Sequence, residues 1–140
     1  MTLELVVVWA GVMLLLYFSV AAGRILTEKD ATSNAAQDGA RAASISRNPT
    51  TAQANARNAA LQDLNHSGLH CQQPININVN TADFQVPVGQ NPNPDNPLTV
   101  TVTVTCVESL SDLIAPGFPI PGTHIERFTF TSVIDQYRVR

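Results

Sequence analysis

The chain has 140 residues, of which 44% are hydrophobic and only 14% are charged, and its formal net charge is −3. A chain of this size has room for one small domain, and its scattered Lys and Arg residues form no basic stripe for binding nucleic acid. It contains no nucleophile elbow, no phosphate-binding loop and no paired carboxylates, so the sequence indicates neither an enzyme nor a cofactor site.

The first predicted element is an apolar run from Leu5 to Gly23 that contains no charged side chain. As a helix this run spans roughly 28 Å, close to the ~30 Å thickness of the hydrocarbon core of a bilayer. In lipid the backbone hydrogen bonds must be satisfied within the segment, so a lone run of this kind is expected to be helical. Taken alone, the run predicts a single membrane anchor.

Two features at the start of the chain are unusual for a simple anchor. Glu4 lies at the edge of the apolar run, and a carboxylate in that position usually has a partner or a task. A signal anchor also normally begins with Lys or Arg, whereas residues 1–4 offer only the terminal amine and a negative charge. We therefore expect that a basic leader preceded Met1 and was removed by cleavage.

No proline interrupts residues 3–46, so this segment is predicted to form one helix, roughly 66 Å long. Any kink is expected near Gly23 or at residues 27–30, in the charged collar that follows the apolar run. In that collar we expect the side chain of Glu28 to lie in water. Beyond it, one face of the helix should carry a stripe of small and apolar side chains. This predicted stripe consists of Ala31, Ala35, Ala42 and Ile45.

Asn48-Pro49 is expected to end this helix, because the residue before a proline is disfavoured in the helical conformation. Thr50 then begins a second helix, and Gln53 three residues later completes a capping-box pattern. The Asn-His-Ser-Gly sequence at residues 65–68 predicts its end. The apolar face of this helix is mostly alanine, so we expect it to pack closely on the sheet or on the first helix. That face consists of Ala52, Ala56, Ala59, Ala60 and Leu64.

From Cys71 onward the hydrophobic period changes to the alternation of β-strands. Four alternating segments with no intervening helix predict an antiparallel sheet with one buried face. Pro87 suggests that its strand lies at an edge. The inward-facing residues of the four predicted strands are Ile75, Ile77 and Val79; Phe84, Val86 and Val88; Leu98, Val100, Val102, Val104 and Cys106; and Phe128 and Phe130, continuing toward Tyr137 and Val139.

Two proline-rich loops connect these strands. Residues 89–97 are polar, whereas residues 109–123 carry apolar side chains between three prolines. Exposed apolar side chains of this kind are expected to be covered by the domain itself or by a neighbouring molecule.

The two cysteines, Cys71 and Cys106, both follow the apolar run. An even pair in an exported segment predicts one disulfide formed in an oxidising compartment. The alternative is a pair of buried free thiols, which behave as small hydrophobic residues.

Two short patterns resemble metal sites, but neither is expected to be one. His66 and His70 are four residues apart, yet a glycine lies between them at a predicted helix end and no fourth ligand is apparent. Asn91, Asn93 and Asp95 alternate like the start of a calcium loop, but the central glycine and the closing glutamate are absent.

A near-terminal glutamate at the head of an apolar helix, then a long alanine-rich continuation and a cysteine-containing sheet, resembles the type IV pilins and pseudopilins. More narrowly, the sequences TLELV at residues 2–6, AGR at 22–24 and DGARAA at 38–43 resemble the TadE-like proteins of tight-adherence systems. The similarity covers about the first 60 residues, and the sheet region matches only in its general pattern. Glu4 matches the glutamate of this family in kind and departs from it in position, since that residue is usually fifth in the mature chain.

The resemblance implies an α+β fold in which a long N-terminal helix, apolar in its first half, packs against a small antiparallel sheet domain with one disulfide. Residues 1–26 would form the apolar helix of a membrane or filament core, 27–68 an amphipathic alanine-rich helical region, and 69–140 the sheet domain. It also implies cleavage before the apolar helix by a prepilin peptidase.

The implied partners are other pilin subunits, the inner membrane before assembly, and the pilus assembly machinery. Packed side by side, such helices would exchange lipid for one another, and a buried Glu4 would need a cationic partner. The nearest candidate is the terminal amine, at Met1, of a neighbouring subunit. Small residues allow helices to approach closely. The small residues expected at these contacts are Gly11, Ala21, Ala22 and Ala35.

Two classes of function therefore remain open. The first is a structural subunit of a Tad-type pilus or pilus-like secretion filament, inserted in the cytoplasmic membrane of a bacterium and then extracellular. The second is a membrane-anchored extracytoplasmic binding domain whose proline-rich loops recognise a partner. In the second class, Glu4 is an interfacial acid and the alanine stripe is an internal packing face.

Overall fold

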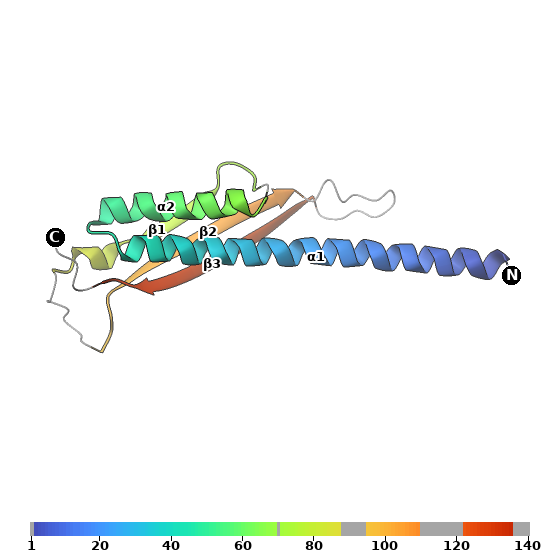
Figure 1. The fold of residues 1–140 in the computed structure, drawn as a ribbon, viewed down its shortest axis with the longest axis horizontal. Coiled ribbons are helices and arrows are strands. Elements are labelled where there is room, and N and C mark those ends of the chain that lie inside the picture. Colours follow the sequence, from blue (N-terminus) through green and yellow to red (C-terminus); the bar gives the residue numbers. More distant parts are fainter. Residues whose placement is uncertain (1, 70, 88–94, 110–121, 136–140) are drawn as a thin grey trace.

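The computed structural model describes residues 2–69, 71–87, 95–109 and 122–135. One long helix projects from a small α+β domain built around its C-terminal half (Figure 1), and the expected fold class is confirmed. The elements in chain order are α1 (Thr2–Ser44), α2 (Pro49–His66), β1 (Asn76–Asn80), the 3₁₀ helix η1 (Ala82–Gln85), β2 (Thr99–Ser109) and β3 (Thr123–Val133).

Helix α1 is continuous over 43 residues, with no break at the charged collar, as the absence of proline predicted. It ends at Ser44, and the next turn closes with a 3.0 Å hydrogen bond from the Ser46 amide to the Ala43 carbonyl. Ile45 therefore lies beyond the helix and is 75% exposed. Its predicted place in the buried stripe was wrong, and Ala42 in the same stripe is only half-buried.

Helix α2 begins with a cap that differs from the predicted one. The Asn48 side chain, in extended backbone conformation, accepts a 2.8 Å hydrogen bond from the Thr51 amide, and Pro49 occupies the first helical position. This is a common helix start, because proline lacks the amide that the first turn leaves unpaired. The capping box of Thr50 and Gln53 is therefore wrong, and the Gln53 amide instead donates to the Thr81 hydroxyl at 3.2 Å.

The end of α2 agrees with the prediction. The Ser67 amide donates to the Asp63 carbonyl at 2.9 Å, and Gly68 follows with φ of 71°. A positive φ in this range favours glycine because a side chain would clash with the backbone.

The three strands form one antiparallel sheet in the order β1-β2-β3. The first, third and fourth predicted strands are therefore confirmed as β1, β2 and β3, although β3 begins earlier, at Thr123. Tyr137 and Val139 lie outside the described residues. Threonine hydroxyls pair across the outer face, Thr101 with Thr131 at 3.0 Å and Thr103 with Thr129 at 2.9 Å.

The predicted strand at Phe84 and Val86 was wrong, because Phe84 lies in η1. The Asp83 carboxylate accepts hydrogen bonds from the amide (2.8 Å) and the hydroxyl (3.3 Å) of Thr99, which hold this turn against the start of β2. The turn directs Phe84 into the core, so one large side chain produced the apparent alternation. Val88 lies outside the described residues, as does most of the loop at 89–97 and all of residues 110–121.

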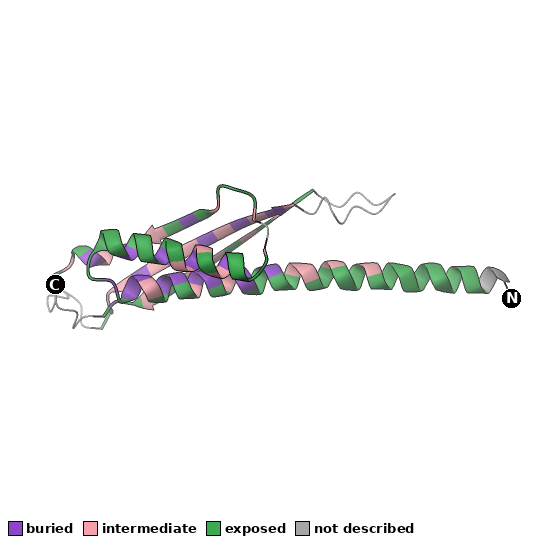
Figure 2. Cartoon of the chain, turned by 45° about the horizontal axis from the view of Figure 1, so that its top comes forward, coloured by how far each residue is buried: buried purple, intermediate pink, exposed green. Residues whose placement is uncertain are grey.

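The two helices pack side by side on one face of the sheet (Figures 1 and 2). The contact is made by alanines of the helices and valines of β2. Gly39 marks the closest approach, since a Cβ atom there would lie 3.1 Å from the Ala56 carbonyl oxygen and 3.3 Å from Cγ1 of Val102. The core thus joins residues from both helices with residues from the sheet. Its fully buried members are Ala35, Ala36, Ala40, Ala43, Ala52, Ala56, Ala60, Leu64, Phe84, Val100, Val102, Val104 and Ile134.

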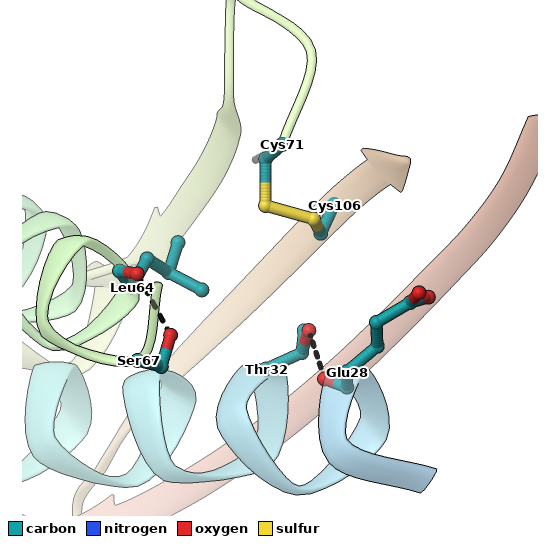
Figure 3. Close-up of a disulfide and its surroundings, with 6 residues drawn as sticks. All are labelled: Glu28, Thr32, Leu64, Ser67, Cys71 and Cys106. Carbon is teal, nitrogen blue, oxygen red and sulfur yellow. Dashed lines mark hydrogen bonds between the residues drawn. A yellow bond between two sulfur atoms is a disulfide. The ribbon is translucent and has the colours of Figure 1, made fainter. Parts of the chain in front are cut away.

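Glu28 is the largest departure from the expected pattern. We expected it to lie in water, but its side chain is 2% exposed. It lies on the same face of α1 as Thr32, whose hydroxyl donates a 2.9 Å hydrogen bond to the Glu28 carbonyl (Figure 3). The helix periodicity therefore turns this charged residue toward the sheet, while its neighbours Lys29 and Asp30 are exposed.

Candidate functional site: the exposed half of helix α1

The N-terminal half of α1 makes no packing contact that buries it. Its large hydrophobic side chains between Leu5 and Val20 are between 44% and 67% exposed. Figure 2 shows the described part of this half as a mostly exposed rod that extends away from the domain. An apolar surface of this length is far from the scattered exposed residues of an ordinary soluble protein. The exposed members are Leu5, Val6, Val7, Val8, Trp9, Val12, Met13, Leu14, Leu15, Leu16, Phe18 and Val20.

By length and composition, α1 is the one helix among the described residues that could cross a membrane. The apolar stretch that satisfies this test is entirely unburied, so it does not serve as the core helix of its own domain. A helix near the N-terminus with these properties weakly supports membrane anchoring.

The hydroxyl groups of Ser19 and Thr27, in and next to the apolar half, donate hydrogen bonds to backbone carbonyls of the same helix. Ser19 donates to the Leu15 carbonyl at 2.9 Å, and Thr27 donates to the Gly23 carbonyl at the same distance. Internal pairing of this kind suits a segment that leaves water, because a bilayer offers no replacement hydrogen bonds. The rings of Tyr17 and Phe18 meet edge to face, with centroids 6.2 Å apart.

The residues proposed for subunit contacts fall into two groups. Gly11 and Ala22 are exposed and Ala21 is half-buried, so these positions on the projecting helix are open to a second helix. Ala35 is fully buried in the core of its own chain, where it serves internal packing. The backbone of Glu4 belongs to α1, whereas its side chain and all of Met1 lie outside the described residues.

Cys71 and Cys106 form the predicted disulfide, with their Cα atoms 5.2 Å apart, and the described residues contain no free cysteine. Cys106 is buried on the helix-facing side of β2 (Figure 3). The segment around Cys71 is also held by a 2.7 Å hydrogen bond from the Gln72 amide to the Val107 carbonyl. The bond therefore fastens the connection after α2 to the middle strand of the sheet.

A shallow depression of about 290 Å³ lies between the two helices, and its lining includes Asp38, Asp63 and His66. Burial raises the pKa of the Asp63 carboxyl, the nearby Asp38 carboxylate raises it further, and His66 opposes the rise. Nδ1 of His66 lies 2.9 Å from the Gln62 carbonyl oxygen.

Within the described ranges, no group of three or more His, Cys, Asp or Glu side chains could hold a metal ion. His70, Asn91 and Asn93 lie outside those ranges.

The sequence analysis did not identify two buried acids, although the spacing of each along its helix or strand indicated that it faces the core. Glu28 lies one helical turn before Thr32 and two before Ala35, on the stripe that packs on the sheet. Glu108 has the same strand parity as Val104 and Cys106, so alternation alone turns it inward. Its side chain is 5% exposed.

No protein-family model matches this chain, and neither a curated protein nor a solved structure shows significant similarity to it.

Proposed function

We propose that the protein is a structural subunit, a pilin or minor pseudopilin, of a Tad-type type IV pilus or a pilus-like secretion filament of the bacterial cell envelope. The observation that carries this proposal is the exposed apolar half of α1, which continues without a break into a domain with its own complete core. A helix of this kind can exchange lipid for the helices of other subunits while the domain remains folded.

The projecting helix suits both environments that a pilin meets. As a monomer it would lie in the cytoplasmic membrane, where its apolar surface faces lipid. In a filament the same surface would face other apolar helices, with the sheet domains on the outside. The hydrophobic effect does not favour one state over the other, so close packing and polar pairs would decide assembly.

Glu4 is the polar group that we assign to this task. In a bundle core its carboxylate would be desolvated, and pairing with the terminal amine of a neighbouring subunit would offset that penalty.

A membrane-anchored binding domain is the second candidate, and the same exposed helix favours it, since one anchor accounts for the apolar surface without any assembly. The two candidates differ in what Glu4 does. In the anchor it is an interfacial acid without a partner, whereas in a filament it is needed for subunit contacts.

The test is the Glu4→Ala variant, expressed in a host with the complete pilus assembly machinery. We expect filaments to be sparse or absent, while the protein reaches the membrane with its disulfide formed. Asp30→Ala is the matched control, because it removes an exposed acid from the same helix and should leave filaments unchanged. Filament yield is counted by electron microscopy and the disulfide is measured by intact mass with and without reductant. Normal filament yield from Glu4→Ala would remove Glu4 from the mechanism.

A further inference from the structure

Two buried acids in the domain have no visible compensation. Glu28 on α1 and Glu108 on β2 are 2% and 5% exposed, and one carboxylate oxygen of each, Oε1 of Glu28 and Oε2 of Glu108, is fully buried without a hydrogen-bond partner. Ionised carboxylates in such surroundings are strongly unfavourable unless they are paired or coordinate a cation.

The fold places these two acids at similar distances from one contact between α1 and β2, on the same side of it. Gly39 and Val102 are in close contact, and α1 and β2 run in opposite directions from that point (Figure 1). Glu28 lies eleven residues back along α1, about 17 Å away. Glu108 lies six residues forward along the inclined strand β2, about 20 Å away. Both side chains belong to the faces that pack together, and Figure 3 shows the Glu28 side chain extending from α1 toward the strands.

Among the described residues, no charged side chain near Glu28 and Glu108 forms an ion pair with either of them. On the neighbouring strand β3, Glu126 is paired in register with Cys106 and His124 with Glu108, and these two side chains bind each other at 2.9 Å. On α1, Arg24 lies one turn before Glu28 and Lys29 is exposed. Apart from His124–Glu126, the ion pair that the described residues form is Asp38–Arg41, so neither Arg24 nor Lys29 is joined to the buried acids.

We propose that Glu28 and Glu108 together bind a hard divalent cation, Ca²⁺ or Mg²⁺, between α1 and the sheet. Oxygen atoms are the ligands that both ions prefer, and the two carboxylates would supply part of a coordination shell that water completes. One divalent ion balances both negative charges at once, whereas protonation has to neutralise each carboxylate separately. The site lies inside the domain, where the projecting helix enters it, and does not depend on filament assembly.

The test uses the full chain in detergent micelles at pH 7, with its disulfide intact. Thermal unfolding of the domain is followed by circular dichroism in EDTA, in calcium and in magnesium, at constant ionic strength. At saturating concentration of the preferred ion we expect the unfolding midpoint to rise on the order of 5 °C. Isothermal titration should give one ion per chain.

Variants locate the site. Glu28→Gln and Glu108→Gln keep the shape of each side chain, and either one should abolish the rise and the binding isotherm. Asp30→Asn, an exposed acid on α1, should retain both. If one of the glutamine variants fails to fold, the other decides the question. Equal midpoints in EDTA and in both ions, or a rise that survives both substitutions, would overturn the proposal.

Discussion

At the scale of single residues, Gly39 controls how closely the helices can approach the sheet. A side chain at this position would meet the backbone of Ala56 in α2 and the fully buried Val102 in β2. Neither neighbour can rotate away, because one is a carbonyl group within a helix and the other is enclosed by the core. A larger residue must therefore push α1 away from its partners.

We expect Gly39→Val to lower the free energy of unfolding by about 2–3 kcal/mol. Gly23→Val is the matched control, because a Cβ atom at Gly23 has nothing within 4 Å, and it should change stability by less than about 0.5 kcal/mol. Urea denaturation of the full chain in detergent measures both. Valine has a higher helix propensity than glycine, so propensity cannot lower stability in either variant. Equal losses in the two variants would therefore contradict the close contacts of Gly39 as the cause.

Asp63 provides a pH-dependent prediction. Its carboxyl pKa is raised in the folded protein, first by burial and then by the Asp38 carboxylate, from the ordinary value of 3.8. The folded state therefore binds this proton more tightly than the unfolded state, so the group lowers stability once pH rises above the folded pKa. We expect Asp63→Asn to raise stability at pH 7 by less than about 0.5 kcal/mol, because the site is partly exposed.

The advantage of Asp63→Asn should vanish as pH falls below 3.8, where the carboxyl is protonated in both states. Urea midpoints at neutral and acidic pH measure it, with Asp30→Asn as the exposed control. A gain that is the same at both pH values would assign the effect to something other than the charge.

At the scale of elements, Asn48 fixes where α2 begins. It caps the helix through the Thr51 amide, whereas Thr50 lies inside the first turn. Asn48→Ala should therefore cost about 1 kcal/mol of stability, and Thr50→Ala, the residue that the sequence pattern had favoured, should cost much less. Thermal unfolding of the two variants distinguishes the assignments, and a larger loss for Thr50→Ala would restore the capping box.

The elements also show which features of a sequence are sufficient for prediction. Helix α1 could be predicted because its 43 residues contain no proline. Strand β2 could be predicted because valine and threonine alternate over enough residues to exclude the period of a helix. Phe84 was misassigned because three alternating residues fit both a strand and a turn with one buried side chain. Its true conformation depends on Asp83 reaching Thr99, sixteen residues away in sequence.

The candidate site was predictable to a similar extent. Leu5 to Gly23 could be identified as an apolar helix because the run carries no charged side chain over a length that matches the core of a bilayer. The burial of Glu28 was missed because charge suggested water, whereas the helix phase set by the alanines decided its direction. Local composition identifies the projecting helix, but which face the domain covers depends on tertiary packing.

At the scale of the whole molecule, one helix performs two physical tasks. Its N-terminal half exposes large apolar side chains, and its C-terminal half buries small ones against α2 and the sheet. Alanine buries little apolar area per residue, so this core yields less hydrophobic stabilisation than one built of leucine and phenylalanine. The domain is therefore held together by an alanine-rich core and one covalent link.

That link, the Cys71–Cys106 disulfide, should make an unusually large contribution to stability. The two residues are 35 apart in sequence, and for a loop of this length the chain-entropy estimate is about 4 kcal/mol. A small domain typically has ~5–15 kcal/mol in total. We expect Cys71→Ser to lower the urea midpoint strongly, to make the domain sensitive to protease, and to leave little filament on the cell surface.

Reduction of the wild-type protein provides the same test without a mutation. Reductant should lower the urea midpoint of the wild type to that of Cys71→Ser, and should leave the midpoint of the variant unchanged. Intact mass and thiol alkylation on protein isolated without reductant measure the bond directly. Two freely alkylatable thiols in that protein would contradict the disulfide, and they would also remove the main support for placing this domain outside the cytoplasm.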